Sequence, residues 1–267
     1  RPPRSTLFPY TTLFRSVDKN ENIYYARLKK HDEFILSKFS DNSSQLWSKT
    51  ITLTTNSSYP ASNLRIQSMD ADSADNIYVV GRSNNNIETN SSENGGMYYL
   101  IKFNSSGDLV WKKSRMGGMD PAACKVMVDE GQHGGVFVTG KYFYSGKFDG
   151  FLEMFDFNGT YKDQELFGTS GEDTPLEMTS GFSLITVAGR TDNTFDSIQN
   201  KPGSDDIFLY TFLKTQHNIY KQKALEFGGS PVDWVNSIHV SGGTDVSGNS
   251  WFTTNDLIQS GNSHFRV

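Results

Sequence analysis

The sequence predicts an all-β chain built from repeated four-stranded units. Three observations support this prediction. Short apolar runs of strand length recur along the chain with turn residues between them. The chain has 24 glycines and is rich in Asn and Ser, which suit the left-handed positions of tight turns. No apolar pattern is sustained at helical spacing.

The clearest repeat unit begins in the Asp-rich segment at residues 70–75. A first strand leads into this segment, and the second strand reads Ile-Tyr-Val-Val-Gly at residues 77–81. The third strand ends in Lys102 and Phe103, and the fourth carries Trp111. Asn104 and Gly107 supply turn chemistry between the third and fourth strands. Related second and third strands follow at residues 135–140, 149–155, 184–189 and 206–212.

A second regular spacing, between the third and fourth strands, supports the repeat. The last Phe of the third strand stands eight positions before an aromatic residue in three units: Phe39 and Trp47, Phe103 and Trp111, Phe212 and Tyr220. In the remaining unit, Asp163 occupies the aromatic position and breaks the pattern.

One four-stranded sheet of this size cannot bury both of its faces, so the units must stack. Four strands per unit favour a β-propeller over a solenoid. We expect a β-propeller fragment of about four to five four-stranded blades, incomplete at both ends.

The repeated pattern resembles the bacterial β-propeller repeat family called SBBP. The matching features are the Asp loop, Asn-Ile-Tyr-Val-x-Gly, the Lys-Phe ending of the third strand, and the following Trp and Gly-Gly. This resemblance implies an exported bacterial propeller, extracellular or at the cell surface, within a larger multidomain protein. It implies no substrate. The expected units cover residues 17–60, 61–118, 119–170, 171–230 and, as a partial unit, 231–267.

Residues 1–16 resemble the translation of a common sequencing-library adaptor. We therefore interpret this segment as an artefact that does not belong to the native protein. The native start of the gene is then expected to be missing, and a signal peptide would not be observable.

Composition excludes several functions. The net charge is −5 and the basic residues are scattered singly, which argues against nucleic-acid binding. No apolar run approaches the ~18–20 residues that span a bilayer. Cys124 is the single cysteine, so an intramolecular disulfide and a multi-cysteine metal site are both excluded.

Three acidic residues are the candidate ligand-binding set. Asp120, Asp173 and Asp233 each follow a Gly-rich linker between units, at about the same repeat position. In a propeller such linkers lie on the face where the central channel opens, so a ring of acids there would attract a cation or a basic partner. The alternative, which we favour, is that each carboxylate caps its own linker.

We expect no cofactor, and calcium is the one alternative that the sequence leaves open. Residues 18–22 and 70–75 each resemble the first half of a calcium loop. In the loop that would begin at Asp18, however, Ile23 stands where Gly is required, and no Glu stands at position twelve. An Asx-turn is the favoured interpretation. Residues 135–141 resemble a phosphate loop, but Tyr142 replaces the required Ser or Thr and the segment reads as a strand.

No arrangement typical of catalysis is evident. We therefore predict a non-catalytic scaffold that binds a protein or a carbohydrate ligand. The alternative is a fragment of a propeller-type carbohydrate-active enzyme, a hydrolase or a lyase. The polar segment at residues 82–96 is expected to be a mobile loop and the best-placed region for contact.

Overall fold

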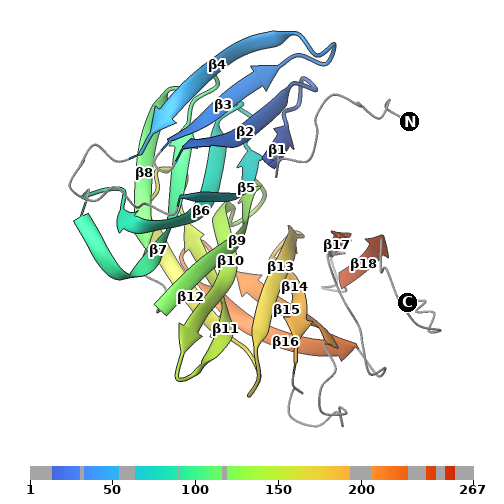
Figure 1. The fold of residues 1–267 in the computed structure, drawn as a ribbon. Coiled ribbons are helices and arrows are strands. Elements are labelled where there is room, and N and C mark those ends of the chain that lie inside the picture. The colour runs from blue at the N-terminus through green and yellow to red at the C-terminus, as the bar shows by residue number, and fades with distance from the viewer. Residues whose placement is uncertain are drawn as a thin grey trace, which may run out of the picture.

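The computed structural model describes residues 14–30, 33–53, 64–89, 91–115, 119–192, 206–227, 239–244 and 250–255. Within these ranges every regular element is a β-strand. The strands form four four-stranded sheets and one two-stranded sheet. The described residues contain no helix that is long and apolar enough to cross a membrane. Figure 1 shows the sheets following one another in an arc.

Each sheet uses consecutive strands, and we call the four complete sheets blades 1 to 4. Blade 1 contains β1 (Phe14–Val17), β2 (Ile23–Lys30), β3 (Glu33–Phe39) and β4 (Gln45–Thr52). Blade 2 contains β5 (Arg65–Ala71), β6 (Ile77–Asn86), β7 (Ser91–Phe103) and β8 (Leu109–Arg115). Blade 3 contains β9 (Met119–Asp129), β10 (Gly135–Tyr144), β11 (Lys147–Phe155) and β12 (Tyr161–Phe167). Blade 4 contains β13 (Asp173–Ser180), β14 (Leu184–Thr191), β15 (Asp206–Lys214) and β16 (Ile219–Phe227). The two-stranded sheet contains β17 (His239–Thr244) and β18 (Ser250–Asn255).

The first strands of the sheets lie side by side. Strand β1 contacts β5, β5 contacts β9, β9 contacts β13, and β13 contacts β17. The fourth strand of each blade lies at the opposite edge of its sheet. This is the arrangement of propeller blades around a common axis. The predicted fold class, an all-β run of four-stranded β-propeller blades, is confirmed.

The core lies between the blades. On β6, Ile77 and Val79 pack into a cluster with Tyr24 and Phe34 of blade 1. The alternate residues Tyr78 and Val80 pack instead against blade 3, in a second cluster. A third cluster joins blades 3 and 4. A blade covered on both faces must be apolar on both, and for this reason the second strands read as apolar runs with imperfect alternation.

Part of the adaptor-like segment is in a strand. Phe14, Arg15 and Ser16 belong to β1 and pair with β2 in antiparallel register. A ladder of this kind is made by backbone N–H and C=O groups, which every non-proline residue carries. The first thirteen residues of that segment lie outside the described residues.

The segment at residues 82–96 differs from the mobile loop that we expected. Strand β6 continues to Asn86 and β7 begins at Ser91, so the segment forms an extended hairpin. Ile87 in its turn is 0% exposed, and its N–H donates to the Ser114 hydroxyl at 2.8 Å. Glu88 accepts a hydrogen bond from the Ser114 N–H, also at 2.8 Å. One buried apolar residue in a polar sequence holds the turn against β8.

Candidate functional site

Two kinds of turn lie at one end of each blade. The turn between the first and second strands, here called the Asp turn, covers residues 18–22, 72–76 and 129–134 in blades 1 to 3. The turn between the third and fourth strands, here called the outer turn, covers residues 40–44, 104–108, 156–160 and 215–218 in blades 1 to 4. Because adjacent strands are antiparallel, both turns emerge at the same end, and the linkers between blades lie at the other.

The Asp turns of blades 1 and 2 are each organised by one carboxylate. Asp18 accepts hydrogen bonds from the N–H groups of Asn20 and Asn22, both at 2.9 Å. Asp72 accepts the equivalent bonds from Ala74 at 3.0 Å and Asn76 at 2.8 Å. These contacts define an Asx-turn at each of the two calcium-like segments.

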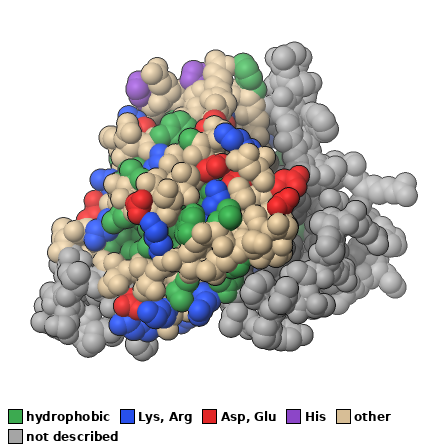
Figure 2. All heavy atoms as spheres, turned by 90° about the horizontal axis from the view of Figure 1, so that it is seen from above, with side chains coloured by type: hydrophobic (Ala, Val, Ile, Leu, Met, Phe, Trp, Pro, Cys, Tyr) green, Lys and Arg blue, Asp and Glu red, His purple; other side chains and the backbone are tan. Residues whose placement is uncertain are grey.

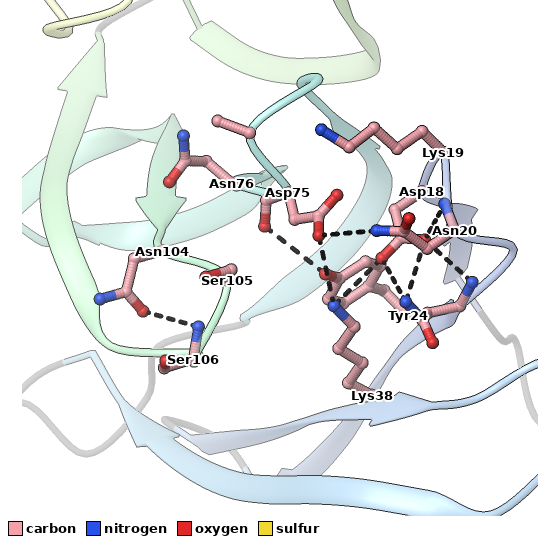
Figure 3. A network of polar contacts seen from close by, with 12 residues as sticks. Asp18, Lys19, Asn20, Tyr24, Lys38, Asp75, Asn76, Asn104, Ser105 and Ser106 are labelled. Atoms are coloured by element: carbon pink, nitrogen blue, oxygen red, sulfur yellow. Dashed lines mark hydrogen bonds and ion pairs between the residues drawn. The ribbon is translucent and has the colours of Figure 1, made fainter.

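A lysine ammonium lies between a carboxylate of the first Asp turn, Asp18, and one of the second, Asp75 (Figure 3). Lys38 Nζ is 3.0 Å from Asp18 Oδ2, 3.7 Å from Asp75 Oδ2 and 4.8 Å from the centre of the Tyr24 ring. Burial alone would raise the pKa of Asp18, but hydrogen bonds from Asn22 and Lys38 lower it to about 2. The lysine thus supplies the positive charge beside these oxygens. Across the described part of the chain, no group of three or more His, Cys, Asp or Glu side chains is arranged to hold a metal ion.

The same charge pairing recurs in the next two blades, but with a change of residue. In blade 2, Lys102 Nζ lies 3.7 Å from Asp72 Oδ2. In blade 3, Met154 takes the lysine position, and Lys214 of blade 4 contacts Asp129 instead. Lys214 is only 1% exposed. The counter-charge for the third Asp turn therefore comes from the following blade.

The outer turns join neighbouring blades. Trp47 of blade 1 donates from Nε1 to the Ser105 carbonyl of blade 2 at 3.1 Å. Trp111 of blade 2 donates in the same way to the Phe157 carbonyl of blade 3 at 3.2 Å. Each Trp ring packs on a turn glycine of positive φ, and a Cβ atom there would lie 2.8 Å from the Trp47 ring at Gly107 and 2.9 Å from the Trp111 ring at Gly159. The aromatic position of the repeat is thus an inter-blade contact.

Asp163, which breaks the aromatic pattern, makes the equivalent connection with different chemistry. Its Oδ2 accepts hydrogen bonds from the Ile219 N–H at 2.8 Å and from Asn218 Nδ2 at 3.3 Å. Asn218 lies in the outer turn of blade 4, which has no glycine for an indole ring to cover. A carboxylate therefore replaces the indole where the next turn offers N–H groups.

The three linker acids are placed as follows. Asp173 is the first residue of β13 and is 0% exposed. Asp120 lies in β9, and its side chain is outside the described residues. Asp233 is also outside the described residues. The structure therefore places Asp173, whereas a ring formed by all three acids remains a prediction.

Asp173 faces a second carboxylate across Gly168. It accepts hydrogen bonds from the Thr169 N–H at 2.7 Å and from the Thr169 hydroxyl at 3.1 Å. A Cβ atom at Gly168 would lie 2.7 Å from Asp173 Oδ2 and 2.5 Å from Asp149 Oδ1. A side chain at this position would therefore require at least one of the two carboxylates to move. Burial raises the pKa of Asp173 to about 6, and the negative charge of Asp149 acts in the same direction.

The raised pKa predicts that Asp173 destabilises the chain as the pH rises. Between about pH 4 and about pH 6 the folded state retains a proton that the unfolded state has lost, so the free energy of unfolding falls by about 2–3 kcal/mol across this range. Asp173→Asn should remove that fall and be more stable than the unsubstituted chain at neutral pH. Urea unfolding at a series of pH values measures both effects. Equal pH slopes in Asp173→Asn and the unsubstituted chain would contradict the prediction, and Asp41→Asn, at an exposed turn, is the matched control.

The sequence did not point to two further groups of charged residues. Glu153 on β11 is 1% exposed and accepts hydrogen bonds from Arg115 on β8, so a buried ion pair joins blades 2 and 3. Lys125 on β9 and Glu177 on β13 pair at 2.7 Å between first strands. Both pairs join residues far apart in the sequence, and no local motif marks them.

On the face seen in Figure 2, acidic and basic side chains are interspersed and hydrophobic ones form small groups.

Comparison with known families supports the repeat. Residues 46–88 match the family model described as Beta-propeller repeat. The match begins in β4 of blade 1 and ends just beyond β6 of blade 2, so the sequence repeat is offset from the structural blade. A search of curated protein sequences finds no match.

Two solved structures show a distant similarity. One is a subtype N10 neuraminidase-like protein of A/little yellow-shouldered bat/Guatemala/060/2010, with 13% identity and a TM-score of 0.45, over 82% of this chain and 60% of that protein. The other is the GH43 endo-arabinanase from Bacillus licheniformis, with 16% identity and a TM-score of 0.41, over 91% of this chain and 92% of the enzyme. At these values neither similarity bears on the chemistry of this chain.

Proposed function

We propose that these blades form a non-catalytic extracellular scaffold, part of a larger exported bacterial protein, which binds a protein or carbohydrate ligand. One observation carries the proposal: the acids at repeat positions bind turns and linkers of the chain itself. Asp18, Asp72, Asp163 and Asp173 each accept hydrogen bonds from backbone N–H groups. A catalytic group needs to be within reach of a substrate. The location outside the cell rests on the resemblance of the repeats to the bacterial family.

A specific observation favours the alternative, a propeller-type carbohydrate-active enzyme. Asp149 and Asp173 form a carboxyl pair in which burial raises the pKa of Asp173 to about 6. Glycoside hydrolases use two carboxyl groups of which one has a raised pKa. However, Asp173 is 0% exposed, so a substrate does not reach it in this arrangement of the blades. The scaffold is therefore the better supported function.

Binding and turnover assays on the same polysaccharides and matrix proteins separate the two functions. We expect binding of at least one member of the panel, with no release of reducing ends or unsaturated sugars. Asp173→Asn should leave that binding unchanged, and Asp149→Asn removes the charge of the second carboxyl group of the pair. Turnover that either substitution abolishes would overturn the scaffold proposal and establish the enzyme.

A further inference from the structure

The connection between the second and third strands of blade 3 is a hairpin rich in aromatic residues. We call residues 141–149, Lys-Tyr-Phe-Tyr-Ser-Gly-Lys-Phe-Asp, the aromatic hairpin. It lies at the linker end of the blade, opposite the Asp turns and the outer turns. Tyr144 beside its tip is 65% exposed, the largest exposed fraction of any large hydrophobic side chain in the described residues. An exposed aromatic ring on a short hairpin is suited to contact with a ligand.

The aromatic hairpin is a rigid support for that ring. Strands β10 and β11 pair without interruption up to Tyr144 and Lys147. Only Ser145 and Gly146 form the turn, both at positive φ, as a two-residue hairpin turn requires. On one side of the hairpin, Phe143 and Phe148 pack edge to face at 5.1 Å. A ring held in place in the free protein loses little conformational entropy when it binds.

The other side of the hairpin combines the exposed ring with polar groups. Residues directly opposite in an antiparallel pair share a face, so Tyr144, Lys147, Tyr142 and Asp149 all lie on this side. Tyr142 packs into the core between blades 2 and 3, and its ring lies 6.2 Å from that of Tyr144. Lys147 pairs with Asp149 and also donates to the Thr169 carbonyl of the linker. The surface is therefore one exposed aromatic ring beside an ammonium–carboxylate pair whose side chains are 28% and 13% exposed.

We infer that this side of the aromatic hairpin is a carbohydrate-binding site, with Tyr144 as the stacking platform. The inference rests on the proposed scaffold function and adds the ligand class and the place of contact. A pyranose ring has an apolar C–H face and a rim of hydroxyl groups. The apolar C–H face fits the flat ring of Tyr144, and the hydroxyl groups fit polar groups such as those of Lys147 and Asp149.

The size of the apolar surface favours a sugar over a protein partner. A stable protein interface buries roughly 800 Å² on each partner around a cluster of apolar anchors. Here the exposed apolar surface is one Tyr ring, flanked by the exposed residues Ser145 and Gly146. That area matches one sugar unit of a polysaccharide chain.

Affinity gel electrophoresis tests the inference with the whole chain. The probes are mannan, xylan, galactan and polygalacturonate, each cast in a native gel. We expect at least one polysaccharide to retard the chain and Tyr144→Ala to weaken that binding at least about tenfold. Tyr220→Ala, which removes a Tyr that is 47% exposed on β16, should bind as the unsubstituted chain does. Equal urea midpoints for both variants would show that the loss is not due to unfolding.

The other outcomes separate this inference from the scaffold proposal. Retardation that persists in Tyr144→Ala would overturn the hairpin site and leave a carbohydrate-binding scaffold with another site. If no polysaccharide retards the chain, the carbohydrate site is overturned. The scaffold proposal would then depend on the panel of matrix proteins.

Discussion

Replacing Asp129 with Ala is expected to cost about 3–5 kcal/mol of unfolding free energy. The reason is that Lys214 would keep a buried positive charge without its partner. Lys214 ends β15 of blade 4 and is 1% exposed, while Asp129 ends β9 of blade 3 and is 8% exposed. Urea unfolding followed by tryptophan fluorescence measures the loss.

Two comparisons make this prediction specific. The double variant Asp129→Ala with Lys214→Met should recover most of the loss, because replacing both members of a buried pair by apolar residues is often close to neutral. Asp72→Ala, the matched change in blade 2, should cost less, because Lys102 also donates to the Phe157 carbonyl at 3.2 Å. An Asp129→Ala variant within about 0.5 kcal/mol of the unsubstituted chain would contradict the prediction, since surface changes have effects of that size.

Replacing Arg115 with Met is expected to be much more damaging than replacing Glu153 with Met, although the two residues form one ion pair. The Arg115 guanidinium donates to Glu153 at 3.2 and 3.3 Å, and the Tyr98 hydroxyl donates to the same carboxylate. Glu153 is 1% exposed, whereas the Arg115 side chain is 33% exposed. Arg115→Met therefore leaves a buried carboxylate without its counter-charge, at a cost of about 3–5 kcal/mol. Glu153→Met leaves an arginine that can turn to water and a Tyr98 hydroxyl without its acceptor, at a cost of about 1–3 kcal/mol.

The pH dependence of the two variants distinguishes this explanation from a general packing defect. Without Arg115, the Glu153 carboxylate is buried with no counter-charge, and burial disfavours its charged form. The folded state of Arg115→Met would then bind a proton that the unfolded state does not, so its stability should rise as the pH is lowered from neutral. Glu153→Met cannot show this rise. Equal losses in the two variants at neutral pH, with parallel pH profiles, would contradict the prediction.

Much of the fold follows from local patterns in the sequence. The eight-residue spacing from the last Phe of the third strand to an aromatic residue identified the third and fourth strands in three of the four blades. The Asp and Asn turns were predicted because a side-chain carboxylate or amide that accepts nearby N–H groups is a local interaction. Trp47 and Trp111, which the spacing picked out as the repeated aromatic position, each contact the next blade.

The candidate site was less predictable. Asp173 was selected from the sequence as a candidate ligand-binding residue, and the structure places it beside Thr169 and Gly168. Its proximity to Asp149 had no sequence signal. The aromatic hairpin was overlooked because residues 141–148 read as a loop between the second and third strands, whereas β10 and β11 continue through them. The polar segment at residues 82–96 was favoured instead as the region of contact, although Ile87 anchors it to the fold. Which connection presents an exposed ring depends on how each hairpin packs against the blade.

The sequence by itself determined the all-β class, the four-stranded repeat and the turn chemistry, because these depend on residues a few positions apart. Only the tertiary structure decided which charges pair between blades. Lys214 and Asp129 are 85 positions apart, and Arg115 and Glu153 are 38 positions apart. Such pairs exist only where two sheets are stacked, and their burial gives them their energetic weight. The exchange of an indole for the Asp163 carboxylate has the same origin, since it depends on the N–H groups that the outer turn of blade 4 presents.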